Sequence, residues 1–215
     1  MSGRHELAVR EMRRAETLNP QSVSLYTAFA LCLRNARCYK EGAEKLRRAL
    51  VLQPDNPTAL QGFNWFVPYL KNYEEAEAAC LKAVEITKRQ NLPLYAYGYA
   101  LATIGRHGEA RKIAKELEAR RSKQYVPSVY IALIHTTQVE AVGSRCEEAL
   151  KSLSRAIAEP TVKNNPIAYS YEIAAAYALL DEKEKAAEWL KIVEKSRANN
   201  YNFAAIDARF ERIRR

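Results

Sequence analysis

Apolar residues recur at steps of three and four along most of this chain. The segment YEEAEAACLKAVEI (residues 73–86) shows this spacing, with small and apolar residues at i, i+3, i+4 and i+7. Such spacing places the apolar side chains on one face of an α-helix and the charged side chains on the other. Only seven glycines and eight prolines occur among 215 residues, which favours long helices over a loop-rich structure. The pattern therefore predicts an all-α protein.

The helical pattern returns with a period of 34 residues. Small residues at this spacing show it most clearly: Ala8, Gly42, Ala76 and Ala110. Pro20 and Pro54 are also 34 positions apart, and proline ends a helix or begins a turn. Beyond Ala110 the period lengthens, since the next matching alanines, Ala149 and Ala186, follow after 39 and 37 positions. Two helices approach closely only where one side chain is small, so the period predicts a helix pair that recurs and stacks on its neighbours.

This repeat resembles the tetratricopeptide repeat, a helix–turn–helix unit of 34 residues. The first full unit, residues 23–56, has the expected kind of residue at eight positions of that pattern: Tyr26, Phe29, Ala30, Leu33, Gly42, Leu46, Ala49 and Pro54. The resemblance implies a right-handed α-solenoid of stacked units. We expect a half repeat or capping helix at 1–22, a capping segment at 201–215, and five units between them, at 23–56, 57–90, 91–124, 125–166 and 167–200.

Three departures from the repeat lead to further expectations. Pro68 lies within the first helix of the second unit and has no backbone N–H, so we expect that helix to bend. Between Leu133 and Ala149 the turn is about five residues longer than the pattern requires. After residue 200 the pattern ends, and three apolar residues are expected to cover the last unit: Phe203, Ile206 and Phe210.

The residue types that carry catalysis or bind metals are scattered. Four cysteines and three histidines show neither CxxC pairs nor zinc-ligand spacing, and His135 has no acidic residue at catalytic spacing. Motifs of nucleotide-binding proteins, metalloproteases and serine hydrolases are missing. We therefore expect no catalytic residues, no metal and no cofactor, and the chain is predicted not to be an enzyme. Without a secretory signal or an apolar run that spans a bilayer, it is predicted to be cytoplasmic and to avoid membranes.

The resemblance also implies where a partner binds, because the first helix of each tetratricopeptide unit lines a concave groove. Seven residues of this chain match groove positions and are the candidate contacts: Leu31, Arg34, Trp65, Tyr95, Tyr99, Leu133 and Tyr171. Aromatic side chains are common anchors of binding surfaces, so we expect a protein or peptide partner. The alternative is that these aromatic residues pack against one another as core. A clamp for acidic chaperone tails is not expected, since Thr27 and Leu31 stand where it needs lysine and asparagine.

The chain carries a net charge of +9, part of which lies in residues 106–123. A basic ridge there would contact nucleic acid or another polyanion through five residues: Arg111, Lys112, Lys115, Arg120 and Arg121. Glutamates alternate with these cations, and no aromatic residues alternate with them to form a stacking platform. We therefore favour an ordinary solvated face with ion pairs at i, i+4 over nucleic-acid binding.

The sequence as a whole predicts a protein–protein interaction scaffold. Two alternatives stay open beside nucleic-acid binding. In the first, the chain is the ligand- or partner-sensing part of a larger bacterial regulator, in keeping with its beginning in the middle of a repeat. In the second, it forms a homodimer through the N-terminal helix, where Leu7, Val9 and Met12 give an apolar face that something must cover.

Overall fold

The computed structural model describes residues 3–70, 73–137, 146–196, 210 and 213. All regular secondary structure in these ranges is helical, so the predicted all-α class is confirmed. No helix within the described ranges is both long enough and apolar enough to cross a membrane. The chain divides into two compact units, unit 1 from Met1 to Ala100 and unit 2 from Leu101 to Arg215.

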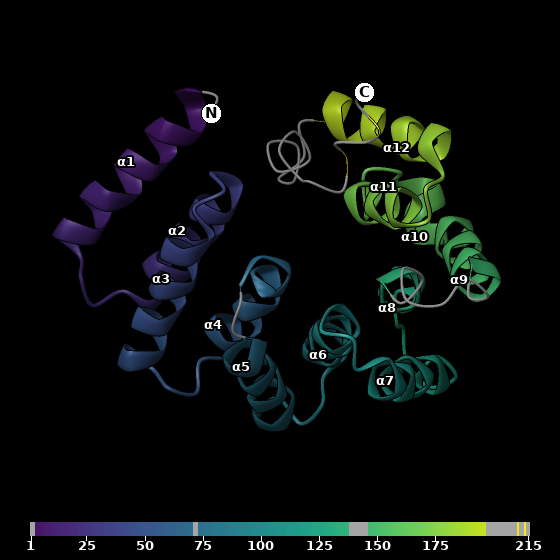
Figure 1. Ribbon diagram of the computed structural model, residues 1–215, viewed down its shortest axis with the longest axis horizontal. Helices are drawn as coiled ribbons and strands as arrows, with labels where there is room; N and C mark the ends of the chain where they lie inside the picture. The colour runs from purple at the N-terminus through teal and green to yellow at the C-terminus, as the bar shows by residue number, and fades with distance from the viewer. Residues whose placement is uncertain (1–2, 71–72, 138–145, 197–209, 211–212, 214–215) are drawn as a thin grey trace. The chain divides into compact units, whose positions relative to one another are not determined.

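The described residues of unit 1 form α-helices and two short 3₁₀ helices. In chain order these are α1 (Gly3–Leu18), α2 (Val23–Asn35), α3 (Tyr39–Leu52), α4 (Pro57–Gly62), η1 (Phe63–Trp65), η2 (Val67–Tyr69), α5 (Tyr73–Ile86) and most of α6 (Asn91–Thr103). Helix α2 packs against α1, α3 and α4, and α4 packs in turn against α3 and α5. Figure 1 labels the α-helices along the chain.

Two helices of unit 1 begin with the same kind of cap, 34 residues apart. The side chain of Ser22 accepts a hydrogen bond from the backbone N–H of Leu25 at 3.2 Å, at the start of α2. The side chain of Asn56 accepts one from Ala59 at 2.9 Å, at the start of α4. Each cap satisfies an N–H that has no partner within its helix and contributes about 1 kcal/mol.

The segment that contains Pro68 does not form the bent helix expected from the sequence. Helix α4 ends at Gly62, and the chain continues as η1 and η2, with Pro68 in the second of these. The prediction of a bend was therefore wrong, because the chain tightens into 3₁₀ turns before proline is reached. Pro68 lies in the first turn of η2, where a backbone N–H has no partner within the helix, so its missing donor costs little there.

Equivalent ion pairs join α1 to α3 and α3 to α5. Arg13 on α1 contacts Glu41 on α3 at 3.1 Å, and Arg47 on α3 contacts Glu75 on α5 at 2.6 Å. Both the arginines and the glutamates are 34 residues apart. The pairs are partly exposed and contribute about 0–1 kcal/mol each. Their recurrence shows that α1, α3 and α5 meet in the same register.

The core of unit 1 contains the residues that the repeat pattern singled out. Of the eight pattern positions in residues 23–56, Pro54 is exposed and the other seven are buried: Tyr26, Phe29, Ala30, Leu33, Gly42, Leu46 and Ala49. Gly42 has a steric reason to be glycine, because a Cβ there would lie 2.5 Å from Cε1 of the buried Phe66 ring. Close packing of α3 against the segment after α4 therefore depends on the absence of a side chain.

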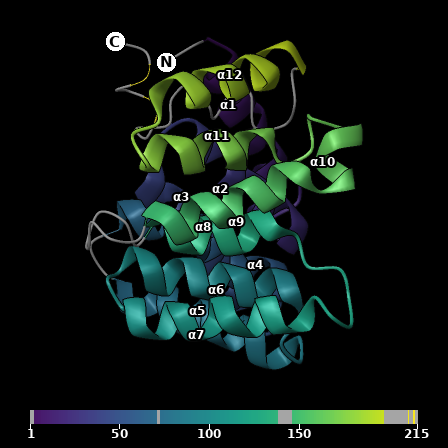
Figure 2. The ribbon, with the colours of Figure 1, turned by 90° about the vertical axis from the view of Figure 1, so that its right-hand side faces the viewer.

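In its described residues, unit 2 comprises the end of α6 and six further helices. These are α7 (His107–Arg120), α8 (Ser128–Thr137), α9 (Cys146–Ala158), α10 (Pro160–Asn164), α11 (Ser170–Leu179) and α12 (Lys183–Ser196). Helix α8 packs against α7, α9 and α11, and α11 packs against α12 (Figure 2). Eight residues separate α8 from α9, whereas three separate α2 from α3 and α11 from α12. The longer turn expected between Leu133 and Ala149 falls on these eight residues. Residues 138–145 of that turn lie outside the described residues.

Three helix pairs close with the same turn. In each pair, the second residue after the end of the first helix has a left-handed backbone conformation: Arg37 (φ 60°), Gly105 (φ 87°) and Asp181 (φ 58°). The next residue donates its N–H to a carbonyl five positions back: Cys38 to Leu33 at 2.8 Å, Arg106 to Leu101 at 2.9 Å, and Glu182 to Tyr177 at 3.0 Å. This is the Schellman arrangement that ends many helices. Each left-handed residue precedes the small residue of its second helix by five positions, at Gly42, Ala110 and Ala186.

Phe210 covers a cluster of unit 2, as predicted. Phe210 is fully buried against side chains of α11 and α12, and Ile213 packs against the same cluster. Phe203 and Ile206, which were expected to do the same, lie outside the described residues.

Candidate binding sites

The candidate groove residues of unit 1 lie on α2, η1 and α6. Leu31, Trp65, Tyr95 and Tyr99 are half-buried, and Arg34 is buried. The guanidinium carbon of Arg34 lies 5.5 Å from the centroid of the Trp65 ring, so a cation–π contact joins α2 to η1. Tyr95 and Tyr99, one helical turn apart on α6, have ring centroids 6.2 Å apart at an interplanar angle of 49°.

In the segment FNWF (residues 63–66), neighbouring aromatic side chains differ in how deeply they are buried. Phe63 and Phe66 are 1% and 0% exposed, while Trp65 between them is only half-buried. A large aromatic side chain next to two fully packed ones has therefore kept part of its surface accessible. Trp65 is held on one side by Arg34, which limits its freedom before any partner arrives.

The two candidate groove residues of unit 2 are covered. Leu133 and Tyr171 are 2% and 8% exposed. The Tyr171 ring meets Phe210 edge to face, with centroids 5.9 Å apart and planes 79° apart. In the described part of the chain these side chains pack as core. A binding role for Tyr171 stays a prediction that would require Phe210 to be displaced.

The five candidate polyanion contacts divide into two groups. Arg120 pairs with Glu116 at 2.7 Å, and Arg121 pairs with Glu159 at 3.2 Å. Lys112 and Lys115 are exposed, and Arg111 is half-buried. Arg120 and Arg121 thus serve contacts within the chain, in keeping with the solvated face favoured from the sequence. Nucleic-acid binding by the other three stays a prediction.

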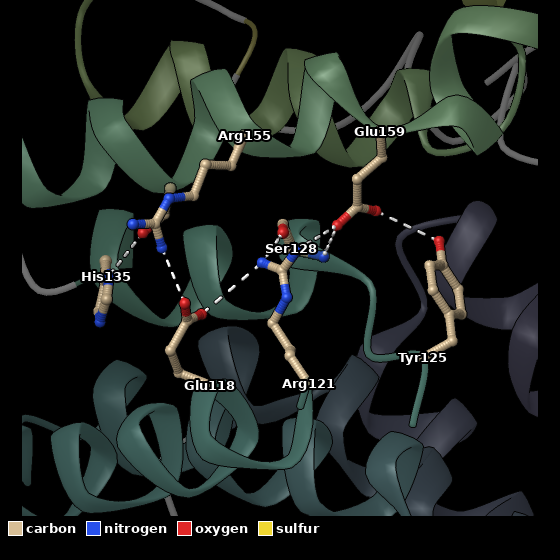
Figure 3. A network of polar contacts seen from close by, with 8 residues as sticks. Glu118, Arg121, Tyr125, Ser128, His135, Arg155 and Glu159 are labelled. Atoms are coloured by element: carbon tan, nitrogen blue, oxygen red, sulfur yellow. Dashed lines mark hydrogen bonds and ion pairs between the residues drawn. The ribbon is translucent and has the colours of Figure 1, made fainter. Parts of the chain in front are cut away.

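Glu159 is the centre of a polar network that the sequence did not reveal (Figure 3). Its carboxylate accepts hydrogen bonds from Arg121 at 3.2 Å, from the hydroxyl of Tyr125 at 3.2 Å and from the backbone N–H of Ser128 at 3.0 Å. Ser128 is the first residue of α8, so the carboxylate also satisfies a free N–H at a helix N-terminus. Glu159 is 9% exposed. Its hydrogen bonds connect the segment between α7 and α8 to the residue that follows α9.

Beside the network of Glu159 lies a second set of polar side chains, which surrounds a pocket between α7, α8 and α9. Nδ1 of His135 lies 3.1 Å from the hydroxyl of Ser152, and Arg155 donates to Glu118 at 2.8 Å (Figure 3). The pocket has a volume of about 180 Å³ and is lined by Ala114, Lys115, Glu118, Ile131, His135, Glu148, Lys151, Ser152 and Arg155. Burial lowers the pKa of His135, whereas the charges of Glu148 and Glu118 act in the opposite direction.

A histidine next to a serine raises the question of nucleophilic catalysis. Such a site also needs a third group that orients the imidazole and donors that stabilise an oxyanion. Within the described ranges no acidic side chain forms a hydrogen bond with the His135 ring, whose bond is to Ser152. The described contacts of His135 thus include no such third group, and the absence of enzymatic activity stays a prediction from the sequence.

No protein-family model matches this chain, and no curated protein matches its sequence. The interpretation of its function accordingly rests on the geometry of its own residues.

Proposed function

We propose that this chain is a tetratricopeptide-like repeat protein that binds another protein or a peptide. Three recurring features support the repeat: the Schellman turns, the caps at Ser22 and Asn56, and the ion pairs of Arg13 and Arg47. The caps and the ion pairs recur after 34 residues, the turns at Arg37 and Gly105 are 68 residues apart, and the turn at Asp181 follows after 76, where the period is longer. In this proposal the chain forms five units between residues 23 and 200, stacked as a solenoid.

The partner-binding surface is proposed to lie in unit 1, with Trp65 at its centre. The observation that carries this assignment is that Trp65 is only half-buried, although it lies between two fully buried phenylalanines. Half-buried aromatic side chains that are already held in place are effective anchors, because binding costs them little conformational entropy. Tyr95 and Tyr99 add aromatic area, and each has a hydroxyl group for hydrogen bonds at the edge of the surface.

An apolar peptide segment is the partner chemistry that fits these residues. Leu31 and the aromatic rings supply apolar area, and the guanidinium of Arg34 is buried against the Trp65 ring. A peptide that carries one or two large apolar side chains would bury this area and gain about 25 cal/mol for each Å² of it.

Affinity capture from the source cells tests the proposal, with and without nuclease. The chain is compared with the Trp65→Ala/Tyr99→Ala variant, and Tyr73→Ala is the matched control because Tyr73 is an exposed tyrosine of unit 1 on α5, outside the candidate surface. We expect a protein that the parent chain and the Tyr73 variant retain and that the double variant loses. Equal capture by all three chains would refute the surface, and capture that nuclease abolishes would favour the basic residues of α7 instead.

A further inference from the structure

The pocket in unit 2 has an apolar side and a polar side. Ala114 of α7 and Ile131 of α8 are buried and form the apolar side, and Ser152 of α9 is buried and bonded to His135 on the polar side. A volume of about 180 Å³ is below the roughly 300–1,000 Å³ that is typical of sites for drug-sized ligands. The pocket therefore suits a small compound, well below the size of a nucleotide or a drug.

Among the described residues, some charged side chains around the pocket form ion pairs with each other, and others do not. Arg155 and Glu118 are bonded to each other, and Glu118 also lies 3.7 Å from Arg121. Lys115 on α7 and Lys151 on α9 are exposed and form no ion pair within the described part of the chain. Three cations and two carboxylates line the pocket, so the excess is positive and comes from two lysines on different helices.

We propose that this pocket binds a small organic monocarboxylate. Its carboxylate lies between the ammonium groups of Lys115 and Lys151, and its short aliphatic tail lies against Ala114 and Ile131. The positive excess is small, and Glu118 and Glu148 also face the pocket, so a ligand with two negative charges is disfavoured. The inference does not depend on the partner surface of unit 1.

His135 couples this binding to pH. Its Nδ1 is engaged by Ser152, which fixes the ring and leaves Nε2 as the second hydrogen-bonding atom. The groups that line the pocket with it are Lys115 and Glu118 of α7, and Glu148, Lys151 and Arg155 of α9. A bound carboxylate adds negative charge beside the imidazole and raises the pKa of His135. By linkage, the ligand binds more tightly as the pH falls through the pKa of His135.

Proton NMR of the full chain gives a direct readout, because the chain has three histidines, His5, His107 and His135. The C2–H resonance of His135 is assigned with a His135→Gln variant. Butyrate, which has six heavy atoms, is added at constant ionic strength against chloride, and 1-butanol, n-butylammonium and inorganic phosphate are added in separate titrations. We expect butyrate to shift the His135 resonance saturably, with a Kd of about 1 mM or weaker for so small a ligand, and to raise its pKa. Butanol, butylammonium and phosphate should give weaker binding.

Charge-removing variants test the site itself. Lys115→Gln and Lys151→Gln should each weaken butyrate binding about fivefold, and the double variant should weaken it more than tenfold. Lys112→Gln is the matched control, because Lys112 is an exposed lysine on α7 that does not line the pocket, and it should change the affinity less than about twofold. Exposed lysines are not needed for folding, which the circular dichroism spectrum of each variant checks. Binding unchanged in the double variant, an unshifted His135 resonance, or tighter binding of phosphate than of butyrate would each overturn the proposal.

Discussion

Replacing Gly42 by alanine tests the close packing in unit 1. The added Cβ would lie 2.5 Å and 2.7 Å from Cε1 and Cζ of Phe66, whereas carbon atoms pack at about 3.5–4.0 Å. The ring must therefore move by about 1 Å, and it has no free space, since Phe66 is fully buried. Such overpacking costs about 1–3 kcal/mol, and alanine recovers about 1 kcal/mol through its higher helix propensity. We expect a net loss of about 1 kcal/mol in the free energy of unfolding of unit 1.

Gly108 provides the matched control for this substitution. It also lies in a helix, α7, but a Cβ at Gly108 would meet nothing within 4 Å. Gly108→Ala should therefore stabilise unit 2 by about 0.5 kcal/mol, since only the propensity gain acts and the position is close to the helix N-terminus.

The two tryptophans allow each unit to be followed separately during urea unfolding. Trp65 lies in unit 1 and Trp189 in unit 2, and the chain has no others. Gly42→Ala is measured by Trp65 fluorescence in a Trp189→Phe background, and Gly108→Ala by Trp189 fluorescence in a Trp65→Phe background. The reasoning is refuted if Gly42→Ala is as stable as its parent or if both substitutions change stability equally. A second change, Phe66→Leu, should relieve the Gly42→Ala penalty, giving a favourable coupling energy of about 1 kcal/mol in a double-mutant cycle.

Three further predictions follow from single buried side chains. Glu159→Gln removes the ion pair with Arg121 and should lower the stability of unit 2 by about 1–2 kcal/mol in urea; an unchanged midpoint would show that the network contributes nothing. Phe210→Ala opens a cavity in the cluster of α11 and α12 and should cost about 2–4 kcal/mol by the same Trp189 assay, unless the end of the chain packs elsewhere. Burial raises the pKa of the Cys80 thiol to about 12, so at pH 8 a fraction on the order of 10⁻⁴ is thiolate; mass spectrometry should find Cys80 unreacted with iodoacetamide in the folded chain and labelled in urea.

Local features of the sequence were sufficient to predict the all-α class. Small residues at helix crossings and prolines at helix ends act on their immediate neighbours, so their 34-residue spacing is visible without a structure. Gly42 shows this clearly, since the same residue that marks the period also permits the contact with Phe66. The end of α4 at Gly62 was missed because helix and 3₁₀ turn differ by small free energies that packing decides, and Leu60, Phe63 and Phe66 are all buried there.

The candidate sites could be predicted only where they depend on a single helix. Trp65, Tyr95 and Tyr99 were identified from their positions in the repeat, and their partial exposure is a property of the folded chain. Tyr171 is different, because its surface is covered by Phe210, which lies 39 residues further along the chain. The partners of Glu159 are 31 to 38 residues away and Ser152 is 17 residues from His135, so these contacts depend on how the helices stack.

The central claim, that a protein partner binds at Trp65, can be tested most directly by the fluorescence of that residue. In a Trp189→Phe chain, the captured partner, lacking tryptophan or with its own tryptophans replaced, is titrated while the Trp65 emission is recorded. Burial of the ring predicts a saturable shift of the emission to shorter wavelength, with the same midpoint as binding measured by calorimetry. Binding that saturates in the calorimeter while the emission of Trp65 stays unchanged would contradict the claim.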